Sequence, residues 1–137
     1  MAYVDDFPTD ARIVRWNMGV AFLALGIGGL FGMVQALHRT GYFRGFVSSA
    51  DYYTLLTGHG VLLALVFTTF ALCGLFTWGI TRSLDRSLPN PRFSAGWFTM
   101  MLVGAVVTAA AILAGLVPSI PMSADVLYTF YAPMQAH

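Results

Sequence analysis

Three long stretches without a charged side chain limit what this chain can fold into. They run from Trp16 to Leu37, from Tyr52 to Thr81 and from Phe93 to Ala124. A helix crosses the hydrocarbon core of a bilayer with about 20 apolar residues, and backbone groups in lipid must hydrogen-bond within their own segment. The pattern predicts an all-α integral membrane protein with three transmembrane helices, at about residues 16–37, 53–81 and 94–117. Two prolines, Pro118 and Pro121, should end the third helix before its charge-free stretch is complete.

The composition agrees with this class. Of the 137 residues, 58% are hydrophobic and 9% are charged, whereas a soluble domain has about 25% charged residues. The length allows one domain at most, so residues 1–137 are expected to form a single unit. The net charge of +1 gives no reason to expect a nucleic-acid partner. A single cysteine, Cys73, excludes an internal disulfide, and within an apolar stretch it should pack as a small hydrophobic residue.

The arginines predict how the helices are oriented. The first apolar stretch is too long for a signal-peptide core and has no cleavage site behind it, so it should remain as an anchor. Five arginines fall on the side of the N-terminus and two on the opposite side. The first group is Arg12, Arg15, Arg82, Arg86 and Arg92, and the second is Arg39 and Arg44. Because basic residues are enriched in cytoplasmic segments, the N-terminus is expected in the cytoplasm.

Small residues in the first and third helices predict close helix packing. Gly28 and Gly32 lie four residues apart in the first helix, and Gly104 stands in an alanine-rich third helix. Such residues let helix backbones approach closely in lipid. Glycine is also simply common in membrane helices, and these faces would equally suit partners outside the chain.

One ionisable side chain lies inside the second predicted helix: His59, in the stretch DYYTLLTGHGVLL. It follows Tyr52 by about seven residues, or about 10 Å along a helix, which places it in the outer half of the membrane. Ionisable groups there are costly and usually functional. The imidazole could bind a metal or haem iron, relay protons, or hydrogen-bond to a neighbouring helix. From the histidine alone the hydrogen bond is favoured, because polar residues often bond between membrane helices.

The residues around His59 change this order. Gly58 and Gly60 remove side chains on both sides of the imidazole, which is the clearance that a flat macrocycle needs. A proton relay would need other titratable groups at similar depth, which the second and third helices lack. A bare metal ion would need two or three further ligands, whereas haem needs one or two axial ligands. Haem ligation therefore ranks above a relay or a bare metal site, and the interhelical hydrogen bond stays open.

The other two histidines are weaker candidates. His38 ends the first helix beside Arg39, at the outer surface, and His137 is the last residue. If His59 binds haem iron, the second axial ligand is expected from another polypeptide or from sequence outside this chain.

Two motifs resemble a known family. The stretch YYTLLTGHGVLLALVFTTF resembles the second helix of subunit I of haem–copper terminal oxidases, and most of all the B-type, ba3-like branch. The tail VLYTFYAPMQAH resembles the segment after that branch's third helix, which usually reads VLYTFYPP. Ala132 replaces the first proline, so the local turn is expected to differ. The resemblance covers essentially the whole chain, but only the first three of the family's dozen or more helices.

The resemblance implies part of the catalytic subunit of a respiratory terminal oxidase. Such enzymes pass electrons from cytochrome c or a quinol to a low-spin haem, and then to a high-spin haem and copper, where O2 is reduced and protons are pumped. It implies that His59 is an axial ligand of the low-spin haem, of b or a type. Gly58 and Gly60 would pack against this haem. Three aromatic residues after the third helix, Tyr128, Phe130 and Tyr131, would contact the haem edge or its propionates, or else form an interfacial aromatic belt.

The resemblance also implies partners and a location. The ligands of the high-spin haem and of copper would lie beyond His137, so the isolated chain is expected to be inactive. The expected partners are the other helices of subunit I, subunit II with its copper electron-entry site, cytochrome c or a quinol, and the lipid bilayer, but no nucleic acid. The expected location is a prokaryotic plasma membrane.

Two other functions fit the same residues. Nitric oxide reductase shares the haem scaffold but has iron in place of copper, and its discriminating ligands also come later in the sequence. A small accessory or assembly subunit without a cofactor would explain the chain length and the small-residue faces. Within the oxidase hypothesis, the chain is expected to be a split subunit, a fragment or a partial trace.

Overall fold

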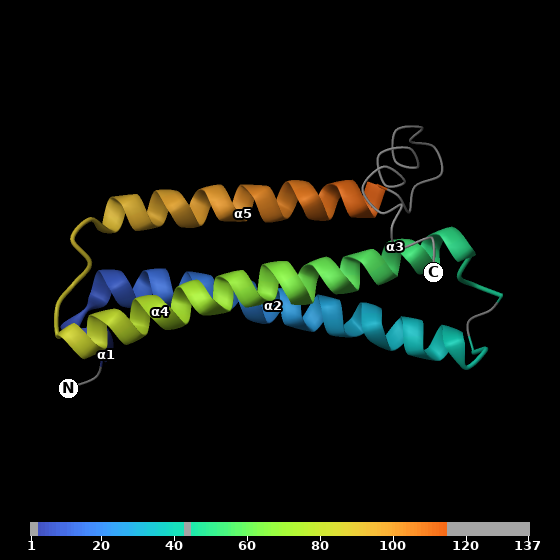
Figure 1. The fold of residues 1–137 in the computed structure, drawn as a ribbon, viewed down its shortest axis with the longest axis horizontal. Coiled ribbons are helices and arrows are strands. Elements are labelled where there is room, and N and C mark those ends of the chain that lie inside the picture. The colour runs from blue at the N-terminus through green and yellow to red at the C-terminus, as the bar shows by residue number, and fades with distance from the viewer. Residues whose placement is uncertain (1–2, 43–44, 115–137) are drawn as a thin grey trace.

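The structure is a computed structural model that describes residues 3–42 and 45–114 (Figure 1). In chain order the elements are α1 (Tyr3–Asp6), α2 (Pro8–Arg39), α3 (Ser49–Gly60), the π-helix η1 (Val61–Phe67), α4 (Thr68–Leu84) and α5 (Pro91–Ala114). These two described ranges contain helices and no strand, so the predicted all-α class is confirmed.

The helices form three long rods, of which α2 is the first (Figure 1). The segments α3, η1 and α4 follow one another without a break and make the second rod, which packs along α2. The third rod, α5, contacts α2 and α3. Each rod is long and apolar enough to cross a membrane, which confirms a multi-pass membrane protein. The bounds of the crossing segments within the helices stay a prediction, and residues 115–117 lie outside the described residues.

Local sequence signals explain where the helices begin and end. Ser48 and Asp51 form a capping box at the start of α3, in which each side chain binds the backbone N–H of the other residue. At α5, the N–H of Phe93 donates to Asn90 Oδ1 at 3.2 Å, and Pro91 occupies the first helical position, where a missing N–H costs nothing. Asp85 ends α4 in the left-handed conformation, with φ 47°.

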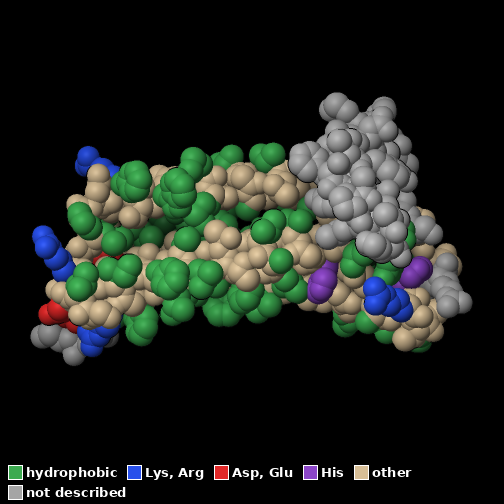
Figure 2. Space-filling model, viewed as in Figure 1, with side chains coloured by type: hydrophobic (Ala, Val, Ile, Leu, Met, Phe, Trp, Pro, Cys, Tyr) green, Lys and Arg blue, Asp and Glu red, His purple; other side chains and the backbone are tan. Residues whose placement is uncertain are grey.

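The surface of the bundle is apolar along its length. Figure 2 shows hydrophobic side chains over the middle of the viewed face and charged side chains at its two ends. Several large residues are more than half exposed, among them Phe22, Leu23, Phe76 and Val107. A surface of this kind suits lipid or further apolar helices.

Close packing of α2 against the second rod is confirmed. A Cβ on Gly28 would lie 2.8 Å from Leu63 Cδ2, and a Cβ on Gly32 would lie 2.7 Å from His59 Cε1. On α4, a Cβ on Gly74 would lie 3.2 Å from Asn17 Cβ. In the third helix, by contrast, a Cβ on Gly104 would meet nothing within 4 Å among the described residues. Gly28 and Gly32 of α2 therefore serve this packing, whereas Gly104 has no such contact among the described residues.

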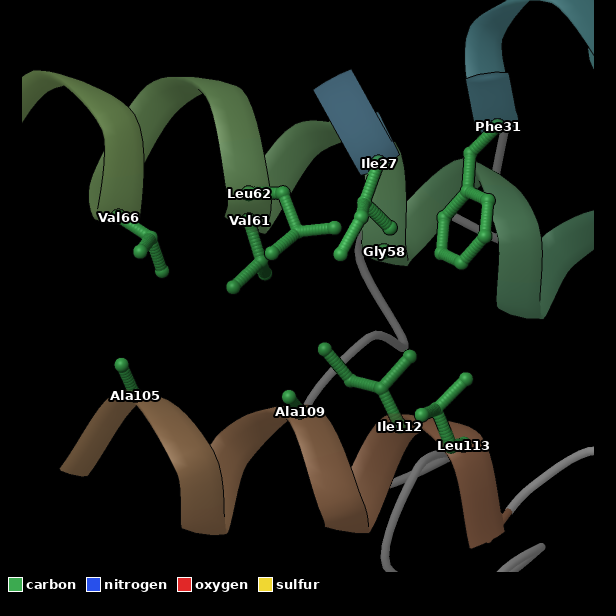
Figure 3. Close-up of a pocket in the computed structure, with 10 residues that line it drawn as sticks. All are labelled: Ile27, Phe31, Gly58, Val61, Leu62, Val66, Ala105, Ala109, Ile112 and Leu113. Atoms are coloured by element: carbon green, nitrogen blue, oxygen red, sulfur yellow. The ribbon is translucent and has the colours of Figure 1, made fainter. Parts of the chain in front are cut away.

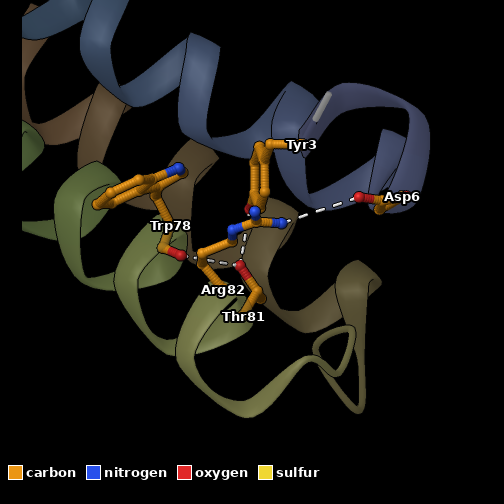
Figure 4. Close-up of polar contacts among 5 residues, drawn as sticks. All are labelled: Tyr3, Asp6, Trp78, Thr81 and Arg82. Atoms are coloured by element: carbon orange, nitrogen blue, oxygen red, sulfur yellow. Dashed lines mark hydrogen bonds and ion pairs between the residues drawn. The ribbon is translucent and has the colours of Figure 1, made fainter. Parts of the chain in front are cut away.

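A hydrogen bond and an ion pair join α1 to the C-terminal end of α4 (Figure 4). Thr81 is 0% exposed and its hydroxyl donates to the Thr77 carbonyl oxygen at 2.8 Å. The Tyr3 hydroxyl, 2.7 Å from Thr81 Oγ1, is therefore the donor of that pair. Arg82 and Asp6 form an ion pair at 3.8 Å with partly exposed side chains, which adds little to stability.

The Tyr3–Thr81 hydrogen bond is expected to stabilise this end of the protein. Tyr3→Phe removes the donor and Thr81→Val removes the acceptor, so each variant should lower the free energy of unfolding. In a double-mutant cycle, the coupling between the two changes should be about 0.5–1.5 kcal/mol. Denaturant unfolding of the detergent-solubilised protein measures it, and strictly additive effects would show that the bond contributes nothing.

An apolar cavity of about 100 Å³ lies between the second rod and α5 (Figure 3). Val61, Leu62 and Val66 of η1 line one side, and Ala105 and Ala109 of α5 line part of the other. Because its walls lack polar partners for water, such a space stays dry. The contact between α5 and the second rod is therefore looser than the contact between α2 and that rod.

Candidate functional site

His59 lies in the last turn of α3, directly before η1, and its side chain is half-buried. The imidazole lies against α2, where Gly32 has no side chain to displace it. A Cβ at position 32 would come within 2.7 Å of Cε1 and 2.9 Å of Nδ1. His59 of the second rod thus packs against the face of α2 that carries Gly28 and Gly32.

One ring nitrogen of His59 is held by the backbone of α2. Nδ1 lies 2.8 Å from the carbonyl oxygen of Gly28. A carbonyl oxygen can only accept, so Nδ1 carries the proton and donates it to this bond. In the neutral ring, Nε2 then has a free lone pair, and no hydrogen bond joins it to another described residue. The hydrogen bond therefore selects Nε2 as the nitrogen that can bind a metal.

The predicted hydrogen bond to a neighbouring helix is confirmed by this geometry. It does not compete with ligation, because metal-bound histidines commonly donate their second nitrogen to a carbonyl or carboxylate. The interhelical hydrogen bond and haem ligation are thus compatible. Nδ1 donates to the backbone of α2, and Nε2 is available to bind iron.

The two glycines beside His59 have different surroundings. A Cβ on Gly58 would lie 2.8 Å and 2.9 Å from two ring atoms of Phe31, a residue of α2. On the side of α2, the space beside Gly58 is thus filled by Phe31, and both residues also line the apolar cavity (Figure 3). A Cβ on Gly60 would meet no described atom within 4 Å, so Gly60 is the glycine that leaves open space beside the histidine. Contact of either residue with haem stays a prediction.

The π-helix after Gly60 is a feature that the sequence analysis missed. The segment η1 widens the helix over Val61–Phe67, and the Thr68 hydroxyl donates to the Ala64 carbonyl oxygen. Short π segments are frequent at functional sites. The stretch VLLALVF gives no sign of it, since its residues suit an ordinary membrane helix equally well.

His38 lies in the last turn of α2, and its ring faces Tyr52 of α3. The ring centroids are 5.1 Å apart, and the buried Nδ1 of His38 has no hydrogen-bond partner in the part of the chain that is described. Arg39 Nε donates to the Tyr52 hydroxyl at 2.7 Å. These contacts place His38 in an aromatic and basic cluster that connects the two rods.

The structure does not bring further candidate ligands to His59. Over residues 3–42 and 45–114, no group of three or more histidine, cysteine, aspartate or glutamate side chains could hold a metal ion. His137 and the aromatic residues Tyr128, Phe130 and Tyr131 lie outside the described residues. The site described here thus offers one nitrogen ligand, which suits one axial position of a haem iron.

Known proteins match this chain over most of its length. Residues 12–137 match the family described as cytochrome c and quinol oxidase polypeptide I. The chain is 36% identical over 138 residues to cytochrome c oxidase subunit 1 of Thermus thermophilus, an alignment that covers 93% of this chain and 22% of the relative. The chain thus spans about a fifth of the length of that protein. No solved structure matches it.

Proposed function

Because the chain belongs to the cytochrome c and quinol oxidase polypeptide I family, we propose that it is part of the catalytic subunit of a respiratory terminal oxidase. We propose that His59 is an axial ligand of the low-spin haem in that subunit. The observation that supports this most is the hydrogen bond from Nδ1 to the Gly28 carbonyl oxygen, since it leaves the Nε2 lone pair for iron.

The surroundings of His59 fit a haem. The imidazole is only half-buried by this chain, and the space next to Gly60 is open. The helices around it are apolar, as the setting of a macrocycle in a membrane requires. Gly58 contributes indirectly. Because it has no side chain, the ring of Phe31 can pack against the backbone of α3, and this contact holds α3, with His59, close to α2.

The role of this chain is to hold and orient one ligand. A bound low-spin haem supplies one-electron transfer between an electron donor and the centre that reduces O2. His59 would hold the iron of this haem through Nε2, and a residue elsewhere in subunit I would supply its other ligand. The high-spin haem and copper are bound by other helices of that subunit, so reduction chemistry and proton pumping take place outside the part described here.

The partners follow from this role. The exposed apolar faces of α2, α4 and α5 are covered by the other helices of subunit I and by lipid. Subunit II brings a copper electron-entry site, and cytochrome c is the donor favoured by the similarity to cytochrome c oxidase subunit 1, with a quinol as the alternative. The complex lies in a prokaryotic plasma membrane with the N-terminus of this chain in the cytoplasm.

Replacing His59 tests the proposal. His59→Ala in the complete oxidase should remove most of the low-spin haem band from the reduced-minus-oxidised spectrum, because a methyl group cannot bind iron. The high-spin haem, bound elsewhere, should remain.

His38→Ala is the matched control, since it removes the other described histidine of the chain and should leave the low-spin band intact. A normal low-spin band in assembled His59→Ala protein would refute the ligand assignment.

A further inference from the structure

We infer that Gly32 is a positioning residue for His59: it exposes the Gly28 carbonyl oxygen to Nδ1 and sets the plane of the imidazole. This inference rests on the proposed function, because its consequence appears in the properties of the haem that His59 would bind. It assigns the pair of small residues on α2 a role beyond helix packing.

Helix geometry explains why the spacing of four matters. In α2 the Gly28 carbonyl oxygen already accepts from the amide of residue 32 within the helix. A carbonyl oxygen has a second lone pair, but a side chain on the residue four positions later normally shields it. With glycine at position 32 this lone pair is accessible, and the N–H of His59 Nδ1 donates to it over an N···O distance of 2.8 Å.

The same glycine sets the plane of the ring. A Cβ at position 32 would lie 2.7 Å from Cε1, 2.9 Å from Nδ1 and 3.5 Å from Nε2. The imidazole is therefore seated directly on the backbone of α2. An alanine here must push the ring away, because the backbone behind the new methyl group belongs to a helix packed on the second rod.

The hydrogen bond also changes the imidazole as an electron donor. Donation from Nδ1 to a backbone oxygen raises the basicity of Nε2 and fixes the ring orientation. A more basic ligand stabilises the ferric state of an iron more than the ferrous state. Loss of the bond should therefore raise the reduction potential of the low-spin haem and change its ferric spectrum.

The test is Gly32→Ala in the complete oxidase. We expect a midpoint potential of the low-spin haem shifted to more positive values, together with altered g-values in its ferric electron paramagnetic resonance spectrum. Gly29→Ala is the open control, because its Cβ would meet no atom of the described residues within 4 Å. Gly74→Ala is the packing control: it adds a methyl group 3.0 Å from Met18 Cε between the same two rods, away from His59. Neither control should move the potential or the g-values.

A second variant tests the bond if Gly32→Ala fails to assemble. Substituting Nδ-methylhistidine for His59 preserves Nε2 but removes the Nδ1 proton, and should also raise the potential. Unchanged potential and g-values in either assembled variant would overturn the inference, as would equal shifts in Gly74→Ala. The proposed function fails separately, only if His59→Ala retains the low-spin haem.

Discussion

Gly58→Leu is expected to abolish most assembly of the oxidase subunit, although it changes no candidate ligand. Its Cβ would lie 2.8 Å and 2.9 Å from ring atoms of Phe31, and 3.7 Å from Ile112 Cγ2. An aromatic ring held between helices cannot move aside as the end of a flexible chain can. Overpacking a well-packed contact typically costs about 1–3 kcal/mol, and a leucine adds three more carbons beyond the Cβ. The amount of subunit recovered in the purified complex measures the effect.

The double variant Gly58→Leu with Phe31→Ala shows whether the contact is the cause. Removing the ring makes space for the leucine, so the double variant should recover more assembled subunit than Gly58→Leu alone. Phe31→Ala by itself should be mildly defective, because it leaves a cavity. A double variant that is no better than Gly58→Leu would mean that the clash lies elsewhere.

Gly60→Leu is expected to have the opposite profile: a normal amount of subunit with most of the low-spin haem lost. No described atom lies within 4 Å of a Cβ at this position, so the described helices leave room for the leucine. What the leucine would displace therefore lies outside residues 3–42 and 45–114. If a haem lies against the helix next to His59, the leucine occupies its place. Haem per assembled subunit, from pyridine haemochrome and protein assays, measures this.

Gly79→Leu is the control for this prediction. It stands on the same rod, in α4, but 19 positions further along the chain. Its Cβ would likewise meet nothing within 4 Å in the part of the chain that the structure describes. It should retain the full low-spin signal. If Gly60→Leu keeps its haem, or loses the subunit and the haem together, the space beside Gly60 is filled by something other than a haem.

Much of the fold could be predicted because its causes are local. Charge-free stretches of sufficient length cannot be anything but helices in lipid, and the three rods contain the predicted spans as far as Ala114. The start of α5 also has a local cause, since Asn90 accepts from the N–H of Phe93 and Pro91 stands at the first helical position. Each of these features depends on residues close together in the sequence.

The candidate site was predicted only in part. His59 could be singled out because an imidazole in an apolar helix is costly and therefore conspicuous. Its partner could not, because the Gly28 carbonyl oxygen is a backbone atom that every residue possesses. The sequence likewise gives no way to distinguish Gly58 from Gly60. In the structure, Gly58 faces Phe31, whereas Gly60 faces no described atom within 4 Å. The π-helix could not be predicted, because its seven apolar residues suit an ordinary membrane helix equally well.

By itself, then, the sequence determined that the chain has three helices long and apolar enough to cross a membrane, and that His59 belongs to the second of them. Both follow from the transfer of side chains and backbone between water and lipid, which depends on composition along short windows. Only the tertiary structure decided which face of α2 receives His59, which nitrogen is bound there and which is left for a ligand. Those outcomes depend on contacts between residues about 30 positions apart, such as Gly28 with His59, and no local pattern specifies them.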